Sequence, residues 1–282
     1  MSTVAEAQQV APAAVAPPRR RRPVRPWRVL PPVGVFALVI GGWYAISYLV
    51  LDDARRFLLP PPHEIIDVGF LDPRNLQQLM RALWLTTEVA LLGLAIAIVV
   101  GVAAAVLMSQ AKWLEVSVYP WVVILQTIPI LALVPLIAQW TGFGFSSRLL
   151  VCVLIALFPI IANTLFGLQS ADAGLRDLFR LHGAGRLTLL VKLMFPASLP
   201  AMFAGFRISA GLSVIGALVG DLFFKQGEPG LGILIDVYRA RLQSEQMYAA
   251  VFLASLLGIA VFLFFGWLGR RVVGKWYQAS RG

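Results

Sequence analysis

The chain has 282 residues, of which 59% are hydrophobic and only 13% are charged. A soluble domain carries about a quarter of its residues as charged side chains, so most of this surface faces something other than water. The net charge of +10 does not indicate nucleic-acid binding, because the basic residues stand at the ends of apolar runs rather than on one groove.

Residues 1–30 are predicted to form a disordered, basic cytoplasmic tail, and residues 31–282 one transmembrane domain. The tail contains Arg19–Arg22, and seven prolines from Pro12 to Pro32 exclude a regular helix. The apolar run that follows, Val33–Leu51, is too long for a cleaved signal peptide, and no small-residue cleavage site closes it. We therefore expect it to be an anchoring membrane helix.

Six apolar segments are long enough to cross a bilayer, which requires about 20 helical residues. The third is expected to kink at Pro129 and Pro135, and the fifth to keep Arg207 and Asp221 near the two membrane surfaces. The sequence therefore predicts an all-α membrane protein with six spans: Val33–Leu51, Val89–Met108, Tyr119–Trp140, Leu149–Leu168, Pro200–Phe224 and Met247–Gly269.

The distribution of basic residues predicts the orientation of these spans. With the N-terminus inside, the inner segments hold fifteen Lys and Arg residues and the outer segments eight, with Arg207 left uncounted. This bias follows the positive-inside rule and places both termini in the cytoplasm. The outer connections would be Asp52–Ala82, with short interfacial helices, and Lys225–Gln246, which begins with a turn signal at Gln226–Gly230.

The cytoplasmic segment between the fourth and fifth spans, about residues 169–199, is longer than a chain reversal needs. Apolar and charged residues alternate at helical spacing before Gly183, and a second helical run, Arg186–Phe195, is expected to end at Pro196. Two short helices that meet at Gly183–Gly185 would form a protruding knob, which a cytoplasmic partner protein could grip.

This loop resembles the signature of permease subunits of binding-protein-dependent ABC importers: Glu-Ala-Ala, three residues, Gly, nine residues, Ile, one residue, Leu-Pro. Gly183 takes the place of the glycine, and Leu193–Pro196 fill the closing positions. Asp177–Phe179 replace the opening triplet, so the acidic position is kept and both small residues are lost.

Three further stretches are similar to the sulfonate, nitrate and taurine branch of these permeases. They are Leu59–Ile65, Gly205–Arg207 and the third span from Gln126 to Gly144. The resemblance covers about residues 58–275 and implies the type I ABC importer fold, in a bacterial inner membrane.

The resemblance implies three protein partners besides the lipid bilayer, and no nucleic-acid partner. They are a cytoplasmic ATPase dimer that binds the ATP and Mg²⁺, a second permease subunit (most simply a second copy) and an extracytoplasmic solute-binding protein. It implies no cofactor, metal site or catalytic residue on this chain. The residues expected to contact the ATPase are Asp177, Arg180, His182, Gly183, Ala184, Gly185, Leu193 and Pro196.

Polar residues inside spans are functional candidates, because a polar group in hydrocarbon costs free energy. Gln126, Thr127, Asn163 and Ser213 are therefore predicted to line a pathway, and hydrogen bonding between helices is the alternative. For Asp221 and Glu88 we expect salt bridges with outer arginines, and for Gly216 and Gly220 close helix packing. Cys152 is expected to be a buried packing thiol.

Gly269–Lys275 matches the first seven positions of a phosphate-binding P-loop, but Trp276 follows where Ser or Thr is required. We interpret this match as coincidence and place ATP hydrolysis on another chain. A self-sufficient secondary transporter is the rival hypothesis, and it predicts acids deep inside spans and inverted repeats. The solute stays open between sulfonate, nitrate or taurine and a pyrimidine-like vitamin precursor.

Overall fold

The computed structural model describes residues 30–277, so the predicted basic tail lies outside the described residues except for Leu30. Within that range every regular element is helical. The α-helices are α1 (Leu30–Ala45), α2 (Pro62–Glu64), α3 (Pro73–Gln110), α4 (Lys112–Thr127), α5 (Ile130–Thr141), α6 (Phe145–Gln169), α7 (Ala173–Leu181), α8 (Arg186–Leu189), α9 (Phe195–Phe223), α10 (Leu231–Ala240) and α11 (Ser244–Tyr277). Three π-helical turns (Ile46–Val50, Ile65–Leu71 and Leu190–Met194) and a 3₁₀-helix (Asp53–Leu58) complete the described elements.

Five helical segments are long and apolar enough to cross a membrane, and a sixth crossing results if α4 and α5 form one broken span. Their axes differ by 100° across a break of at most four residues. Pro129 causes the break, because it has no N–H to donate and forces Ile128 into extended backbone at φ −67° and ψ 125°. The predicted kink at Pro129 is confirmed, while α5 runs without interruption past Pro135.

Two helices are longer than the apolar runs predict. Helix α3 begins sixteen residues before Val89, at Pro73, because Asp72 accepts a hydrogen bond from the backbone N–H of Arg74 at 2.9 Å and caps it. The expected helix end at Pro196 is wrong. Helix runs from Arg186 to Phe223, because the π-helical turn just before Pro196 changes the hydrogen-bond register there.

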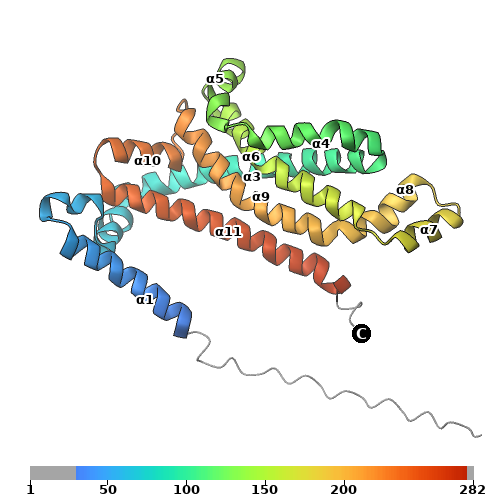
Figure 1. The fold of residues 1–282 in the computed structure, drawn as a ribbon. Helices are drawn as coiled ribbons and strands as arrows, with labels where there is room; N and C mark the ends of the chain where they lie inside the picture. Colours follow the sequence, from blue (N-terminus) through green and yellow to red (C-terminus); the bar gives the residue numbers. More distant parts are fainter. Residues whose placement is uncertain (1–29, 278–282) are drawn as a thin grey trace, which may run out of the picture.

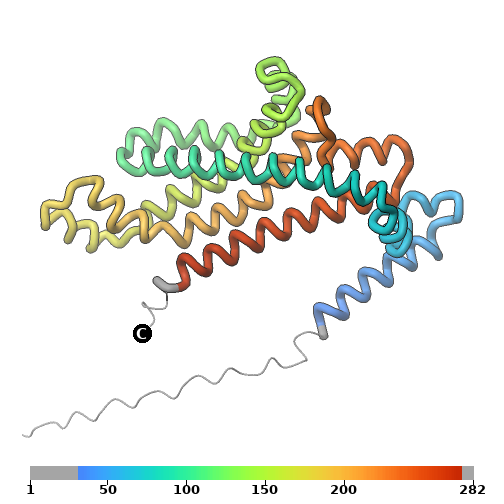
Figure 2. The backbone as a smooth tube through the Cα atoms, turned by 180° about the vertical axis from the view of Figure 1, so that it is seen from behind, coloured from blue at the N-terminus to red at the C-terminus, as the bar shows by residue number. Residues whose placement is uncertain are grey.

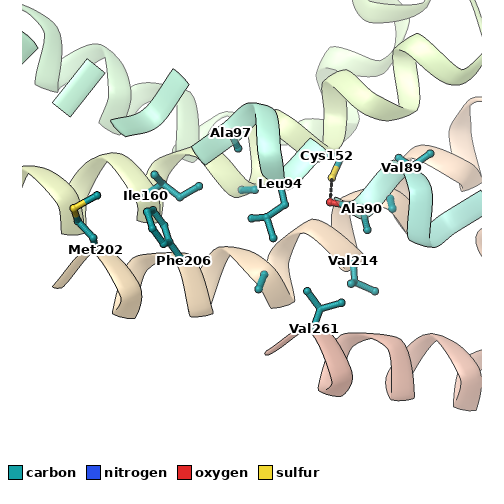
Figure 3. Packing of buried hydrophobic residues seen from close by; sticks show 13 residues of the cluster. Val89, Ala90, Leu94, Ala97, Cys152, Ile160, Met202, Phe206, Val214 and Val261 are labelled. Atoms are coloured by element: carbon teal, nitrogen blue, oxygen red, sulfur yellow. Dashed lines mark hydrogen bonds between the residues drawn. The ribbon is translucent and has the colours of Figure 1, made fainter. Parts of the chain in front are cut away.

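Helices α3, α6, α9 and α11 form the bundle, as Figures 1 and 2 show from opposite sides. Figure 3 shows side chains from all four meeting in one cluster, which includes Leu94, Ile160, Phe206 and Val261. Cys152 is fully buried in this cluster, and its thiol lies 3.2 Å from the carbonyl oxygen of Ser213. The predicted packing role of Cys152 is confirmed.

Helices α6 and α9 pack antiparallel with their backbones in close contact. An added Cβ at Gly216 would lie 2.8 Å from Cys152 Cα, and one at Gly220 would lie 2.9 Å from Arg148 Cα. The predicted close packing at these glycines is confirmed, and Gly205 repeats it nearer the start of α9, at 2.8 Å from the carbonyl oxygen of Pro159. In a membrane such contacts hold helices together by dispersion, since lipid tails remove the hydrophobic driving force.

The two ends of the bundle carry different elements. Figure 1 shows α7, α8 and the last turns of α11 at one end, and α10 with the segment before it at the other. Helix α1 points away from the bundle (Figure 1). The C-terminal part of α1 is attached to the segment that follows it, because the indole N–H of Trp43 donates to the carbonyl of Pro60 at 3.0 Å.

Candidate functional site

The first candidate site is the α7–α8 loop, by which we mean α7, α8 and the turn between them. The Asp172 carboxylate caps α7 by accepting a hydrogen bond from the backbone N–H of Leu175 at 2.9 Å. Arg176 reaches back to the carbonyl of Leu168 at 3.3 Å. The Arg176 side chain therefore attaches the loop to the last turn of α6.

Gly183 ends α7 in the left-handed conformation, with φ +70°. The N–H of Gly183 donates to the carbonyl of Arg180 at 2.9 Å, and the N–H of Ala184 to that of Phe179 at 3.0 Å. This pair of bonds is the Schellman motif, which satisfies carbonyls that the helix end would leave unpaired. Glycine is favoured at this position because of φ, and an added Cβ at Gly183 or Gly185 would meet open space.

The outer surface of the α7–α8 loop exposes apolar side chains outside the bundle. Leu181 is 85% exposed and Leu187 is 75% exposed. Leu178, Phe179, His182, Ala184, Thr188 and Lys192 line a shallow groove of about 400 Å³. Asp177 and Arg180 form an exposed ion pair at 3.5 Å, and the His182 ring bonds to the carbonyl of Leu178. The structure thus brings the predicted residues from Asp177 to Gly185 together at one exposed knob.

Leu193 and Pro196, which were predicted to contact the same partner, lie elsewhere. Leu193 packs against the cluster of Leu168, Leu190 and Met194 at the foot of the loop. Pro196 follows the π-helical turn Leu190–Met194 inside the continuous helix, where the changed hydrogen-bond register accommodates its missing N–H. In the described structure Leu193 therefore packs at the base of the loop rather than on its exposed surface.

The four residues predicted to line a pathway lie on three different helices, α4, α6 and α9. Gln126 and Thr127 are exposed at the last turn of α4, beside the 100° break, and the Thr127 hydroxyl bonds to its own helix. Asn163 donates to the carbonyl of Pro159 at 2.8 Å, and the buried Ser213 hydroxyl donates to that of Ala210 at 2.9 Å. Their pathway role stays a prediction.

A buried ion pair lies at the opposite end, in what we call the outer junction (Thr86, Arg148, Asp221 and residues 224–232). Arg148 is 1% exposed and Asp221 is fully buried, and Arg148 Nη1 lies 3.2 Å from Asp221 Oδ1. The expected salt bridge between Asp221 and an arginine is confirmed, with Arg148 as the partner. It does not hold for Glu88, which has no ion pair within residues 30–277.

The guanidinium of Arg148 also holds the segment between α9 and α10. Its three nitrogens donate to the carbonyls of Phe224, Gln226 and Glu228 at 2.8, 2.9 and 3.0 Å. Thr86 donates to Asp221 at 3.0 Å and accepts from the N–H of Leu231 at 2.8 Å. A Cβ at Gly230 would collide with the Asp221 carboxylate. One buried arginine thus fixes this segment.

The sequence alone did not identify Arg148 as the partner of Asp221. It also gave no sign that Thr86 hydrogen-bonds to Asp221 and Leu231. Both pairings join residues far apart in the chain, so local spacing carries no sign of them. A usable signal was the combination of Asp221 with Gly230 and Gly232, because two glycines beside an apolar helix indicate close approach of another group.

Comparisons with known proteins agree with these observations. A family model described as "Binding-protein-dependent transport system inner membrane component" matches residues 97–274. The chain is 32% identical to the formylaminopyrimidine transport permease protein ThiX of Halalkalibacterium halodurans, over 84% of this chain and 92% of that protein. It is 28% identical to a putative aliphatic sulfonates transport permease protein, SsuC, of Bacillus subtilis, over 87% of each chain. A crystal structure of an amino acid ABC transporter with histidines shares the fold, with a TM-score of 0.54, 16% identity and coverage of 69% of this chain and 94% of that one.

Proposed function

The chain belongs to the family of binding-protein-dependent transport system inner membrane components. From this premise we propose how this permease subunit couples to a separate ATPase. The α7–α8 loop is the element that a cytoplasmic ATPase dimer grips. Nucleotide-driven movement of the ATPase displaces this loop and, through α6 and α9, opens the pathway on alternate sides of the membrane.

The observation that supports this proposal is the exposure of Leu181 on α7, outside the apolar spans, and of Leu187 in the first turn of the helix that continues into α9. Large apolar side chains gathered on a surface mark a site of contact with another molecule. The adjoining groove, with Phe179 on its wall, offers room for a side chain of the partner. Gly183 sets the angle between the two helices that form the surface.

Leu181→Asp tests the proposal without removing a contact inside the chain, because Leu181 is 85% exposed. We expect normal amounts of the variant in the membrane, loss of the ATPase on co-purification, and loss of uptake. Leu58→Asp is the matched control, since Leu58 is an exposed leucine (53%) beyond the C-terminal end of α1. Full uptake by Leu181→Asp with the ATPase still bound would refute the coupling role of the loop.

The remaining partners follow from the same proposal. A second copy of the chain completes the pathway, with Gln126 and Thr127 at the α4–α5 break and Asn163 and Ser213 in the spans as candidate lining residues. An extracytoplasmic binding protein delivers the solute to the end that carries the outer junction. ATP and Mg²⁺ bind the partner ATPase, and both termini of this chain lie in the cytoplasm.

For the solute we propose a small anion of the sulfonate, nitrate or taurine type, supported by the similarity to the sulfonate permease protein. A pyrimidine-like vitamin precursor is the second candidate, favoured by the 32% identity to the formylaminopyrimidine permease protein. Uptake of each labelled solute by cells that express the complete transporter, with competition between the two classes, distinguishes them.

A further inference from the structure

A groove between α9 and α11 contains two arginines, Arg207 and Arg270, that have no carboxylate partner within residues 30–277. The groove has a volume of about 320 Å³, and Phe203 and Phe265 contribute to its apolar walls. It lies toward the end of α11 that Figure 1 shows near the α7–α8 loop.

The side chain of Arg207, which lines this groove from α9, lies against α11. It is exposed on α9, and its guanidinium carbon lies 4.0 Å from the centre of the Phe262 ring. At Gly266 an added Cβ would lie 3.3 Å from Arg207 Nε, so the absence of a side chain leaves room for the guanidinium. Arg270 follows Gly266 by four residues, which is about 6 Å along the helix.

The surroundings of the two arginines favour a counter-charge. An arginine on the outside of a membrane helix is costly unless it reaches water, a carboxylate or a phosphate. The planar guanidinium matches the geometry of phosphate oxygens, and two guanidiniums that line one groove from neighbouring helices can contact one headgroup from two sides. Basic pockets between membrane helices are suited to anionic lipid headgroups, and an apolar wall beside them suits an acyl chain.

The same groove accounts for the glycines of the P-loop-like string. Gly269, Arg270 and Gly274 line it, on a continuous helix rather than on a phosphate-binding loop. A Cβ at Gly269 would lie 3.1 Å from the side chain of Phe203, so glycine there lets α9 and α11 approach closely. The glycines thus shape a groove between two helices instead of cradling a nucleotide.

We propose that this α9–α11 groove binds an anionic phospholipid such as phosphatidylglycerol. Arg207 and Arg270 contact the phosphate, and the aromatic wall of Phe203 and Phe265 receives the first part of an acyl chain. Arg271 supplies a built-in comparison, because it lies over the Trp267 ring at 5.3 Å and does not line the groove. The inference is independent of the coupling role proposed for the α7–α8 loop.

The test uses the full-length chain, purified with its partner subunits in detergent and stripped of lipid. Native mass spectrometry measures binding of added phosphatidylglycerol, phosphatidylcholine and inorganic phosphate. We expect phosphatidylglycerol to bind in preference to phosphatidylcholine, and inorganic phosphate not to displace it. Arg207→Gln with Arg270→Gln should weaken phosphatidylglycerol binding by about 25-fold, or about five-fold for each arginine. Arg271→Gln should change it by less than about two-fold, because Arg271 does not line the groove.

Three results would overturn the proposal. Equal binding of the two lipids would show that the headgroup charge is not recognised, and displacement by inorganic phosphate would assign the arginines to a soluble anion. Unchanged lipid binding by the double variant, with loss of its dimeric state, would assign the groove to a protein contact. Arg207→Lys and Arg270→Lys guard against misfolding, because each keeps the charge and should retain the preference for phosphatidylglycerol.

Discussion

The two ends of the bundle are built in opposite ways. At the outer junction, the buried Arg148 and Asp221 and three carbonyls bonded by one guanidinium fix the segment after α9. In the α7–α8 loop the ion pair of Asp177 and Arg180 is exposed, and leucines face outward. The first region pairs its buried charges within one chain, whereas the second leaves large apolar side chains exposed.

We expect the largest loss of stability when the buried ion pair of Arg148 and Asp221 is broken. Asp221→Ala leaves Arg148 buried without its counter-charge, which costs about 3–5 kcal/mol of unfolding free energy. Thermal unfolding of the purified protein in detergent measures this loss. The double variant Arg148→Met with Asp221→Leu should be more stable than Arg148→Met alone, because it also removes the carboxylate that the single change leaves buried without its counter-charge. Additive losses from the two changes would contradict this account.

Filling the contact between α6 and α9 should have the next largest effect. Gly220→Ala puts a Cβ 2.9 Å from Arg148 Cα, and because backbone cannot move aside easily we expect a loss of about 1–3 kcal/mol. Gly211→Ala, on the same helix, meets nothing within 4 Å. It should be neutral or stabilising by up to about 1 kcal/mol. Equal melting temperatures for the two variants would show that the helices are not in contact at Gly220.

Gly183→Asp should affect the partner more than the fold. A residue with a side chain at φ +70° costs about 1 kcal/mol locally, and no span is touched. We expect normal membrane levels, poor co-purification of the ATPase and lost uptake. Gly185→Asp adds the same charge at φ −69° and separates strain from charge. If Gly183→Asp keeps full uptake with the ATPase bound, the loop is not the coupling element.

The smallest predicted effect concerns Asp236 on α10, outside the membrane spans. Hydrogen bonds from Lys225 and then from Arg239 hold the pKa of Asp236 below its usual value. Because the pKa of Asp236 is lowered in the folded protein, its ionised carboxylate stabilises the fold at neutral pH. This stabilisation is lost as the pH falls through the lowered pKa, below about 4. Since the pair is at the surface, Asp236→Asn should cost less than about 1 kcal/mol at pH 7. Melting temperatures from pH 3 to 7 would show the two proteins converging at the acidic end.

The sequence was sufficient for features that depend on neighbouring residues. Apolar runs predict the spans, Pro129 predicts the kink, and Gly183 predicts the junction of α7 and α8. The sequence was insufficient for features that depend on contacts between segments far apart in the chain. Arg148 and Asp221 come together only when α6 and α9 pack against each other. The helix continues past Pro196 through a π-helical turn that no residue type in this segment predicts. The identity of α4 and α5 as one span or two depends on a bend whose size the proline does not fix.

The glycine contacts between α6 and α9 have a mechanical consequence. At Gly205, Gly216 and Gly220 no glycine side chain separates the two helices, and a shift of one helix along the other would bring larger side chains into these contacts. We therefore expect the two helices to move as one rigid unit, with the α7–α8 loop near one end and the outer junction near the other. A displacement of the loop would then tilt both helices together, and the displacement at the outer junction would depend on the point about which the two helices pivot.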